Sequence, residues 1–283
     1  MKIYRCLLFT PANDQKKIIK LKEIRVDAVI LDLEDSVPIQ EKEKGRKNVL
    51  ELMNTIKGNK AIGVRINSFE SKMWLKDILQ IVEANPDFIM IPKVKNEKEI
   101  EVISKTLKSL NSQIPLIASI EDGEGLSRVF KIAKSCDEII ALMFGKIDFN
   151  ASIGGEEGNF AEMLARALVS IAASTNNLQA IDSPCIDLKD LKKLEEEARI
   201  AKSMGYTGKT AIHPSQIEII NKIFTPSKSE YENALKIIEV YEKAKRENLG
   251  AIRFEDKMID EAVVKHAKRI VGLYENVMKL QEN

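Results

Sequence analysis

The sequence has few of the residues on which several classes of protein depend. Its 283 residues include only three cysteines, Cys6, Cys136 and Cys185, and two histidines, His213 and His266. An odd number of cysteines with no paired or metal-ligand spacing argues against a disulfide scaffold and against a zinc centre. Because such cysteine usage suits a reducing compartment, we expect a cytoplasmic protein.

Long apolar runs and an excess of charge of one sign are also absent. The apolar stretch from Cys6 to Phe9 is shorter than the roughly 7 to 15 residues of a secretory core. No other stretch approaches the roughly 20 apolar residues of a membrane span. Lys and Arg number 44 against 43 Asp and Glu, a formal net charge of +1. This balance argues against a nucleic acid or a membrane surface as an electrostatic partner.

Short runs rich in Ile, Val and Leu alternate along the chain with longer charged segments of helical periodicity. The runs cover residues 5–11, 28–35, 61–67, 88–94, 115–121, 138–145, 179–184 and 209–214. Eight strand-then-helix units predict a parallel sheet that closes into a (β/α)8 TIM barrel. The alternative is an open doubly wound sheet, although no G-x-G-x-x-G or G-x-x-x-x-G-K-[ST] loop follows the first run.

The barrel should be complete before Pro226, which interrupts the chain. We therefore predict a barrel over residues 1–226 and a C-terminal helical extension over 227–283. Helices are expected over about residues 227–248 and 258–280, where apolar side chains recur at helical spacing.

Polar residues fall late in the predicted strands, where a barrel of this kind places its chemistry. Side chains alternate along a strand, so residues two apart share a face. The polar pairs that share a face are Asp32 and Glu34, Arg65 and Asn67, Ser119 and Glu121, and Lys209 and His213. Because their neighbours of opposite parity are apolar, we expect the polar set to point inward at the mouth and the apolar set to pack against the helices.

Each of these residues also has a purely structural alternative. A carboxylate at a strand end caps helices or pairs with lysine, Arg65 could serve in a structural ion pair, and His213 could be a satisfied hydrogen-bonding residue. Taken together, however, several carboxylates beside an arginine suit a divalent metal with an acidic substrate. Oxygen ligands without a Cys or His cluster favour Mg²⁺ over Zn²⁺, and arginine recognises carboxylates in a bidentate manner.

At this point the sequence resembles a known family, the citrate lyase beta-subunit-like proteins of the Mg-dependent aldolase/citrate lyase superfamily. The resemblance spans nearly the whole chain. The matching stretches are 5–13 (RCLLFTPAN), 31–37 (LDLEDSV) with Lys44 and Arg46, 64–67 (VRIN), 91–93 (IPK), 120–121 (IE), 144–148 (FGKID), 180–182 (AID), 208–217 (GKTAIHPSQI) and 257–260 (KMID).

The resemblance implies a role for individual residues. Glu121 and Asp148 match the two magnesium ligands of the family, and Arg65 matches its substrate-binding arginine. Asp260 matches an aspartate that acts as acid/base in a neighbouring subunit's site. From the matching stretches we expect three classes of site residue: catalytic Arg65, Glu34 and Asp260; substrate-binding Arg65, Glu121, Arg5 and Lys93; and Mg²⁺ ligands Glu121 and Asp148.

The family chemistry predicts a Mg²⁺-dependent carbon–carbon lyase. Its substrate would be a 3-hydroxyacyl-CoA of the malyl-CoA or citramalyl-CoA type, cleaved to acetyl-CoA and a small 2-oxo acid, and its assembly a homotrimer. Three alternatives remain: a CoA-independent 2-oxo-acid aldolase, a citrate lyase beta subunit, and a non-catalytic subunit that binds a 2-oxo acid. The non-catalytic subunit remains an alternative because the turn before Asp260 differs from that of the family. Many relatives have Asp-Gly immediately before the lysine that matches Lys257, whereas this chain has Glu255 and Asp256.

Overall fold

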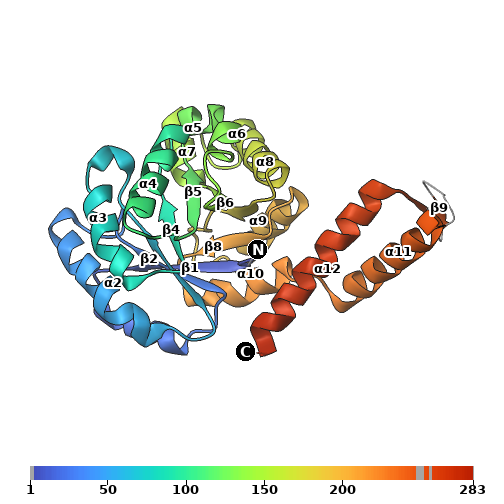
Figure 1. Cartoon of the computed structure of the whole chain (residues 1–283), viewed down its shortest axis with the longest axis horizontal. Helices are drawn as coiled ribbons and strands as arrows, with labels where there is room; N and C mark the ends of the chain where they lie inside the picture. The colour runs from blue at the N-terminus through green and yellow to red at the C-terminus, as the bar shows by residue number, and fades with distance from the viewer. Residues whose placement is uncertain (1–2, 247–251, 255–256, 283) are drawn as a thin grey trace. The chain divides into compact units, whose positions relative to one another are not determined.

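The computed structural model describes residues 3–246, 252–254 and 257–282 and contains a closed barrel of eight parallel strands (Figure 1). The strands are β1 (Cys6–Pro11), β2 (Ala28–Asp32), β3 (Ala61–Arg65), β4 (Phe88–Ile91), β5 (Leu116–Ile120), β6 (Ile139–Phe144), β7 (Gln179–Asp182) and β8 (Gly208–Ala211). Each strand pairs with the next, and β8 pairs with β1. The (β/α)8 prediction is confirmed, and the open sheet is excluded.

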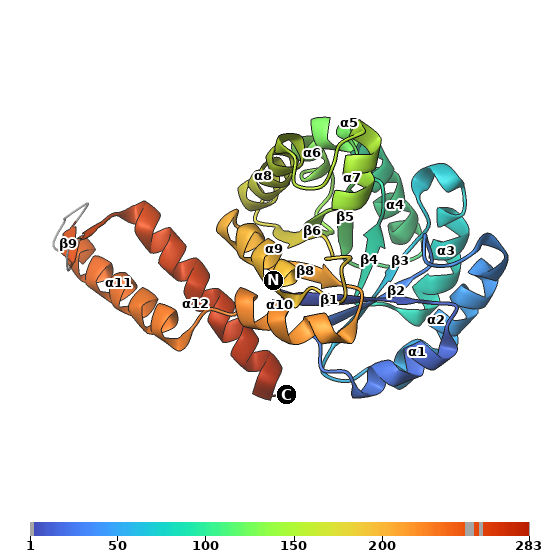
Figure 2. The ribbon, with the colours of Figure 1, turned by 180° about the vertical axis from the view of Figure 1, so that it is seen from behind.

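Helices lie around the outside of the strands, as the two opposite views show (Figures 1 and 2). They are α1 (Gln15–Lys20), α2 (Lys42–Ile56), α3 (Trp74–Ile81), α4 (Glu97–Ser109), α5 (Gly123–Ser127), α6 (Val129–Ile132), α7 (Lys146–Ile153), α8 (Phe160–Thr175), α9 (Leu191–Ser203) and α10 (Ile217–Phe224). Short 3₁₀ turns lie at Leu21–Glu23, Ile39–Glu41, Phe69–Ser71, Val82–Ala84 and Pro214–Gln216.

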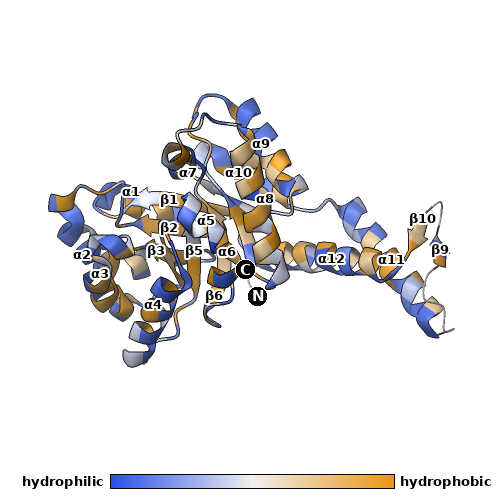
Figure 3. Cartoon of the chain, turned by 90° about the horizontal axis from the view of Figure 1, so that it is seen from above, coloured by the Kyte–Doolittle hydropathy of each residue, from blue (hydrophilic) through white to orange (hydrophobic). Residues whose placement is uncertain are grey.

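The interior of the barrel is a packed core. It contains Leu7, Ala28, Ile30, Ala61, Phe88, Met90, Ile117, Ala141, Met143 and Ile181. Ala28 and Ile30 have the parity of Asp32, so the predicted alternation is confirmed on β2: this parity points inward. Val29 and Leu31 are also fully buried, because the helices cover the outer face of the sheet. The strands are accordingly among the most hydrophobic parts of the chain (Figure 3).

The chain divides into two compact units, Ile3–Asn221 and Lys222–Asn283. Within the second unit α11 (Lys228–Arg246) packs against α12 (Glu261–Glu282), with the rings of Tyr231 and Tyr274 stacked at 4.3 Å. Between these helices β9 (Ile252–Phe254) pairs antiparallel with β10 (Lys257–Ile259). The last helix therefore begins three residues later than expected from the sequence, because residues 257–259 form a strand. Glu255 and Asp256 lie outside the described residues.

No helix among the described residues is both long enough and apolar enough to span a membrane.

The contact between β3 and β4 generates a test of barrel packing. Gly63 faces Phe88 across the two strands, and a Cβ at position 63 would lie 2.0 Å from the ring. We expect Gly63→Ala to destabilise the protein by about 1 to 3 kcal/mol in urea unfolding, because the buried ring must shift. Gly58→Ala is the control, since nothing lies within 4 Å of its added Cβ, and we expect a change within about 0.5 kcal/mol. Replacing the ring by a smaller side chain in Gly63→Ala/Phe88→Leu should recover part of the lost unfolding free energy. Equal losses in Gly63→Ala and Gly58→Ala would contradict the packing argument.

Candidate active site

Four predicted residues meet where the strands end at the carboxyl side of the barrel. Arg65 ends β3, while Glu34, Lys93 and Glu121 follow β2, β4 and β5. Nη1 of Arg65 lies 3.3 Å from Oε2 of Glu34, and Nζ of Lys93 lies 2.8 Å from Oε1 of the same carboxylate. Parallel strands place all their carboxyl ends at one rim, which is why residues far apart in the sequence converge here.

Arg65 is held in one orientation by two contacts. Its Nε and Nη2 donate to the two carboxylate oxygens of Asp32 at 2.6 and 2.7 Å. Its guanidinium carbon lies 4.7 Å from the centre of the Phe9 ring, a cation–π distance. Burial alone would lower the pKa of Arg65, but the hydrogen bonds that Arg65 donates to Asp32 outweigh burial and raise it. The group therefore stays charged, with Nη1 turned toward Glu34.

Asp32 is the fixed partner in this pair. Besides Arg65 it accepts hydrogen bonds from the backbone N–H of Glu34 at 2.9 Å and from the backbone N–H and hydroxyl of Ser36 at 3.1 and 2.5 Å. Burial pushes the pKa of Asp32 up, but these donors and the charge of Arg65 hold it below its usual value. The sequence pattern places Asp32 at the mouth with Glu34 but assigns it no role in the site; the structure shows that it anchors Arg65.

Glu34 is a buried carboxyl group, with 5% of the residue exposed. Burial raises its pKa to about 7, with the negative charges of Glu121 and Asp35 acting in the same direction and Arg65 and Lys93 opposing them. Its Oε2 has no hydrogen-bond partner among the described residues. Nζ of Lys42 donates to the backbone carbonyl of Glu34 at 2.6 Å, which holds the backbone of this residue in place. Glu34 can therefore hold or release a proton near neutral pH.

Lys93 has a strained backbone. Its φ is +51°, in the left-handed region that residues other than glycine rarely adopt. Its Nζ bridges Glu34 at 2.8 Å and Asp35 at 2.9 Å. Strained residues of this kind concentrate at functional sites, so the backbone supports a functional role for Lys93.

Glu121 and Asp148 form a second pair of carboxylates. Glu121 is 4% exposed, and its Oε2 is buried without a hydrogen-bond partner among the described residues. Burial raises the pKa of Glu121, and the negative charge of Asp148 in the first turn of α7 raises it further. Gly145 leaves the necessary space, because a Cβ at position 145 would lie 2.5 Å from Cγ of Glu121.

This donor set fits a hard divalent cation. A cation beside Oε2 of Glu121 would satisfy its orphaned lone pairs and relieve the repulsion from Asp148. Among the described residues no group of three or more His, Cys, Asp or Glu could hold a metal, so the protein side chains supply few ligands. Mg²⁺ matches this arrangement, since it is bound through one or two carboxylates with water and substrate completing its octahedron.

Two further predicted residues are Arg5 in the barrel unit and Asp260 in the second unit. Arg5 was predicted to bind substrate, but it precedes β1 at the opposite, amino end of the barrel, where it forms a buried ion pair with Asp27 at 2.6 Å. The prediction for Arg5 is therefore wrong. Asp260 lies in the second unit, exposed, and caps α12 by accepting the backbone N–H of Val263 at 3.0 Å.

A pocket of about 510 Å³ also lies at the amino end of the barrel, among residues that include Asn85, Asp87 and Asn111. Oδ2 of Asp87 is already used to accept the backbone N–H of Ile62. The amino end of such barrels serves stability rather than catalysis, so we assign no chemistry to this pocket.

The chain is similar to known proteins over most of its length. The family described as HpcH/HpaI aldolase/citrate lyase matches residues 5–214. The chain is 30% identical to an L-malyl-CoA/beta-methylmalyl-CoA lyase of Rhodobacter capsulatus, over 95% of this chain and 94% of that protein. It is 33% identical to the mitochondrial citramalyl-CoA lyase of Mus musculus, over 95% of this chain and 85% of that protein.

Solved structures share the fold at comparable identity. The protein CitE from Mycobacterium tuberculosis, in complex with magnesium, acetoacetate and coenzyme A, superposes with a TM-score of 0.77 and 27% identity. That match covers 95% of this chain and 97% of the other. The same protein with magnesium and pyruvate gives a TM-score of 0.71 and 25% identity, over 94% and 97% of the two chains.

The pKa of Glu34 generates a test with a definite sign. The folded state raises this pKa from 4.5 to about 7 and therefore favours the protonated carboxyl. The resulting stabilisation is complete below about pH 4.5 and is lost as the pH rises through about 7. We expect Glu34→Gln, a mimic of the neutral carboxyl, to exceed the wild type in unfolding free energy by about 1 to 3 kcal/mol at pH 8.5. The difference should shrink toward zero at pH 5.

Urea unfolding with a chelator present at both pH values makes the measurement, because a bound cation would change the charge near Glu34. Glu156→Gln is the control, since Glu156 is an exposed residue that loses the same charge. A Glu34→Gln variant that is less stable than the wild type at pH 8.5 would contradict the assignment.

Proposed function

The chain belongs to the HpcH/HpaI aldolase/citrate lyase family, and we propose that it is a Mg²⁺-dependent carbon–carbon lyase acting on a 3-hydroxyacyl-CoA of the malyl-CoA or citramalyl-CoA type. The products would be acetyl-CoA and a small 2-oxo acid. One observation carries the proposal: the guanidinium of Arg65, held by Asp32, lies at the same rim as a buried carboxylate oxygen of Glu121 that has no hydrogen-bond donor in the described part of the chain. The named relatives, which are malyl-CoA and citramalyl-CoA lyases, support the substrate class.

Glu121 and Asp148 would hold Mg²⁺. When bound, the metal supplies a Lewis acid that polarises the oxygen that becomes the ketone of the 2-oxo acid. The raised pKa of Glu121 implies competition between a proton and the cation, because both neutralise the same buried charge.

Arg65 would bind the carboxylate of the acid half of the substrate. Its orientation is set before substrate arrives, since Asp32 occupies Nε and Nη2 and Phe9 lies against the guanidinium carbon. A fixed cation loses little freedom on binding, and it would stabilise the negative charge that the hydroxyl oxygen beside this carboxylate gains as its proton leaves. This is the differential stabilisation of the transition state on which the rate depends.

Two proton transfers accompany the cleavage. The 3-hydroxyl group loses its proton as the bond between C2 and C3 breaks, and C2 of the released thioester gains one. Glu34 would accept the hydroxyl proton, because it lies beside Arg65, which holds the same half of the substrate, and because its pKa of about 7 suits a base at neutral pH. Asp260 of a neighbouring copy would supply the proton to C2, as the matching stretch 257–260 suggests.

The shared role of Asp260 leads us to infer a homotrimer, in which head-to-tail contacts close a ring and each copy completes its neighbour's site. We also infer a cytoplasmic location. The described chain contains three free cysteines, Cys6, Cys136 and Cys185, as expected in a reducing compartment.

Release of acetyl-CoA tests the activity. Purified protein with Mg²⁺ should release acetyl-CoA from malyl-CoA or citramalyl-CoA, and chelator should abolish the release. Glu121→Gln should lose at least about 100-fold in kcat/KM and most of its Mg²⁺ affinity, because a metal ligand is replaced by a neutral amide.

The same assay separates the alternatives. Release of a 2-oxo acid from free hydroxy-oxo acids, with no turnover of either thioester, would replace the proposal with a CoA-independent aldolase. Mg²⁺-dependent binding of 2-oxo acids without any turnover would replace it with a binding subunit. Unchanged turnover and Mg²⁺ binding in Glu121→Gln would contradict the metal assignment.

A mixing experiment tests Arg65 and Asp260 together. Arg65→Lys keeps the positive charge but loses the planar set of N–H donors of the guanidinium, so we expect kcat/KM to fall at least about 10-fold. Asp260→Asn should fall similarly, because it cannot carry the proton. When equal amounts of the two variants are unfolded, mixed and refolded, up to about a quarter of the sites in a closed ring should receive both native residues, and activity should rise.

Arg128→Lys is the matched control, because Arg128 forms a similar two-bond pair with Glu97, at 2.7 and 2.9 Å, outside the cluster of Arg65, Glu34, Lys93 and Glu121. We expect its kcat/KM to stay near that of the wild type. Activity in the mixture that does not exceed the mean of the two variants would contradict the shared site.

A further inference from the structure

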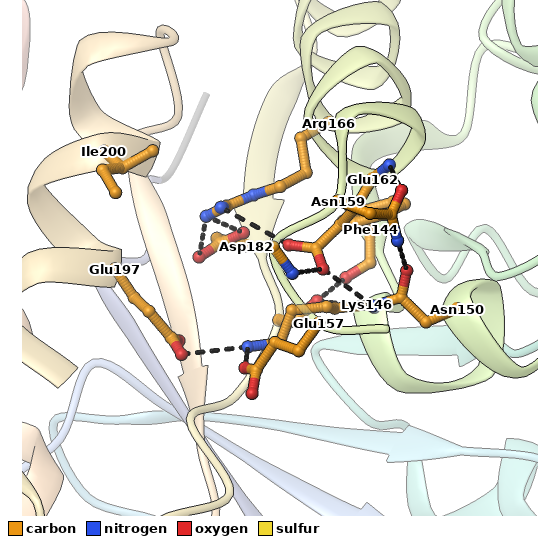
Figure 4. Close-up of polar contacts among 12 residues, drawn as sticks. Phe144, Lys146, Asn150, Glu157, Asn159, Glu162, Arg166, Asp182, Glu197 and Ile200 are labelled. Atoms are coloured by element: carbon orange, nitrogen blue, oxygen red, sulfur yellow. Dashed lines mark hydrogen bonds and ion pairs between the residues drawn. The ribbon is translucent and has the colours of Figure 1, made fainter. Parts of the chain in front are cut away.

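A second polar cluster lies beside the mouth, on the side of β6, β7 and α9 (Figure 4). At its centre is Lys146, the first residue of α7, which is only 5% exposed. Its ammonium pairs with Glu157 in the loop before α8 and with Glu197 on α9, the latter at 2.9 Å. We call these three residues the Lys146 clamp. The ammonium of Lys146 donates a hydrogen bond to each of these carboxylates, so Lys146 is held between the loop and α9.

The loop that carries Glu157 is tied down at several points. Lys193 on α9 donates to the other oxygen of Glu157 at 2.8 Å. The backbone N–H of Gly155 donates to the carbonyl of Asn150 at 2.9 Å, and that of Gly158 donates to Glu162 at 2.9 Å. The Gly-rich stretch 154–158 is thus anchored between α7, α8 and α9, and Glu157 is presented to Lys146 from a defined position.

The turn between β6 and α7 is also fixed by hydrogen bonds to the ends of neighbouring strands. The hydroxyl of Ser183, after β7, donates to the carbonyl of Phe144 and accepts the backbone N–H of Lys146 at 2.5 and 2.7 Å. The backbone N–H of Gly145 donates to the carbonyl of Ile120, the residue before Glu121, at 2.9 Å. These bonds tie the start of α7 to the ends of the two neighbouring strands.

Asp148 depends on this turn for its position. It lies in the first turn of α7, two residues after Lys146, and its side chain makes no hydrogen bond or ion pair with the described part of the chain. Glu121 is enclosed and close to Gly145, whereas Asp148 is exposed. The backbone of the first turn of α7 therefore decides how far the carboxylate of Asp148 lies from that of Glu121.

We propose that Lys146 and Glu157 are positioning residues for Asp148 and that the Lys146 clamp thereby sets the affinity of the barrel mouth for Mg²⁺. The proposal rests on the function proposed above, in which Glu121 and Asp148 are the ligands. Lys146 neither binds the cation nor touches the substrate in this proposal; its charge anchors the turn, and Glu157 neutralises that charge from the loop side. Residues that orient metal ligands in this indirect way commonly change metal affinity about 10- to 100-fold when they are replaced.

Mg²⁺ titration calorimetry on the full-length protein tests the inference. We expect Glu157→Gln to weaken Mg²⁺ binding about 10-fold, with kcat restored to near the wild-type value at saturating Mg²⁺. Glu157→Asp, which keeps the charge, should recover part of the affinity. Glu156→Gln is the matched control: it removes the same charge one residue earlier in the same loop, from an exposed side chain that makes no contact with Lys146.

Glu157 has a side chain that is 41% exposed, so its variants should fold, and circular dichroism with a thermal melt verifies this. Folded Glu157→Gln with the same Mg²⁺ affinity as Glu156→Gln would overturn the clamp, as would a kcat that stays low at saturating Mg²⁺. Glu121→Gln identifies a failure of the underlying function. If that variant binds Mg²⁺ as the wild type does, the metal site itself is wrong; if only Glu157→Gln does so, the clamp alone is wrong.

Discussion

Asp32 and Arg65 are register partners on the adjacent strands β2 and β3, and the rest of the mouth depends on their pairing. The pair puts a guanidinium at the rim with two of its nitrogens occupied and a third turned toward Glu34. A buried ion pair contributes little to stability on its own, because desolvation offsets the attraction, but removing one partner leaves a charge that burial makes expensive. The same energetics make the orientation of Arg65 hard to change, which suits its proposed recognition of a substrate carboxylate.

Around this fixed pair, two carboxyl groups at the mouth are in surroundings that disfavour their ionised form. Glu34 and Glu121 are both buried, both have a raised pKa, and each keeps one oxygen without a hydrogen-bond donor among the described residues. Asp32, at a similar depth, accepts several hydrogen bonds and has a lowered pKa. The difference is the number of donors: a satisfied carboxylate serves as an anchor, whereas an unsatisfied one is available to a proton or a cation. The arrangement thus makes Asp32 an anchor and leaves Glu34 and Glu121 suited to the chemical roles proposed for them.

The two carboxylates suited to a cation differ in how they are held. Glu121 is positioned by its surroundings, with Gly145 against its side chain and little exposure to water. Asp148 is positioned by its helix, whose first turn is tied to neighbouring strands by Ser183 and Gly145 and to α9 through Lys146. Disturbance of the loop at residues 154–158 would therefore reach one carboxylate and leave the other in place. Coupling of this kind travels through contacts that can be named one by one.

The sequence by itself determined the barrel and most of the mouth. Eight apolar runs with turn-separated helices admit one natural closure, and the parity of Asp32, Glu34, Arg65 and Glu121 already places them on one face, because strand periodicity is a local property. Arg5 opens its apolar run whereas Arg65 lies late in its own, so strand position already separates the two arginines; the expectation that Arg5 binds substrate came from the family resemblance. Only the tertiary structure shows Asp27 pairing with Arg5 at the amino end and Asp32 pairing with Arg65 at the mouth. The roles of Lys146, Ser183 and Glu197 were likewise decided by the fold, because their partners are 11 to 51 residues away in the sequence and become neighbours only when the barrel closes.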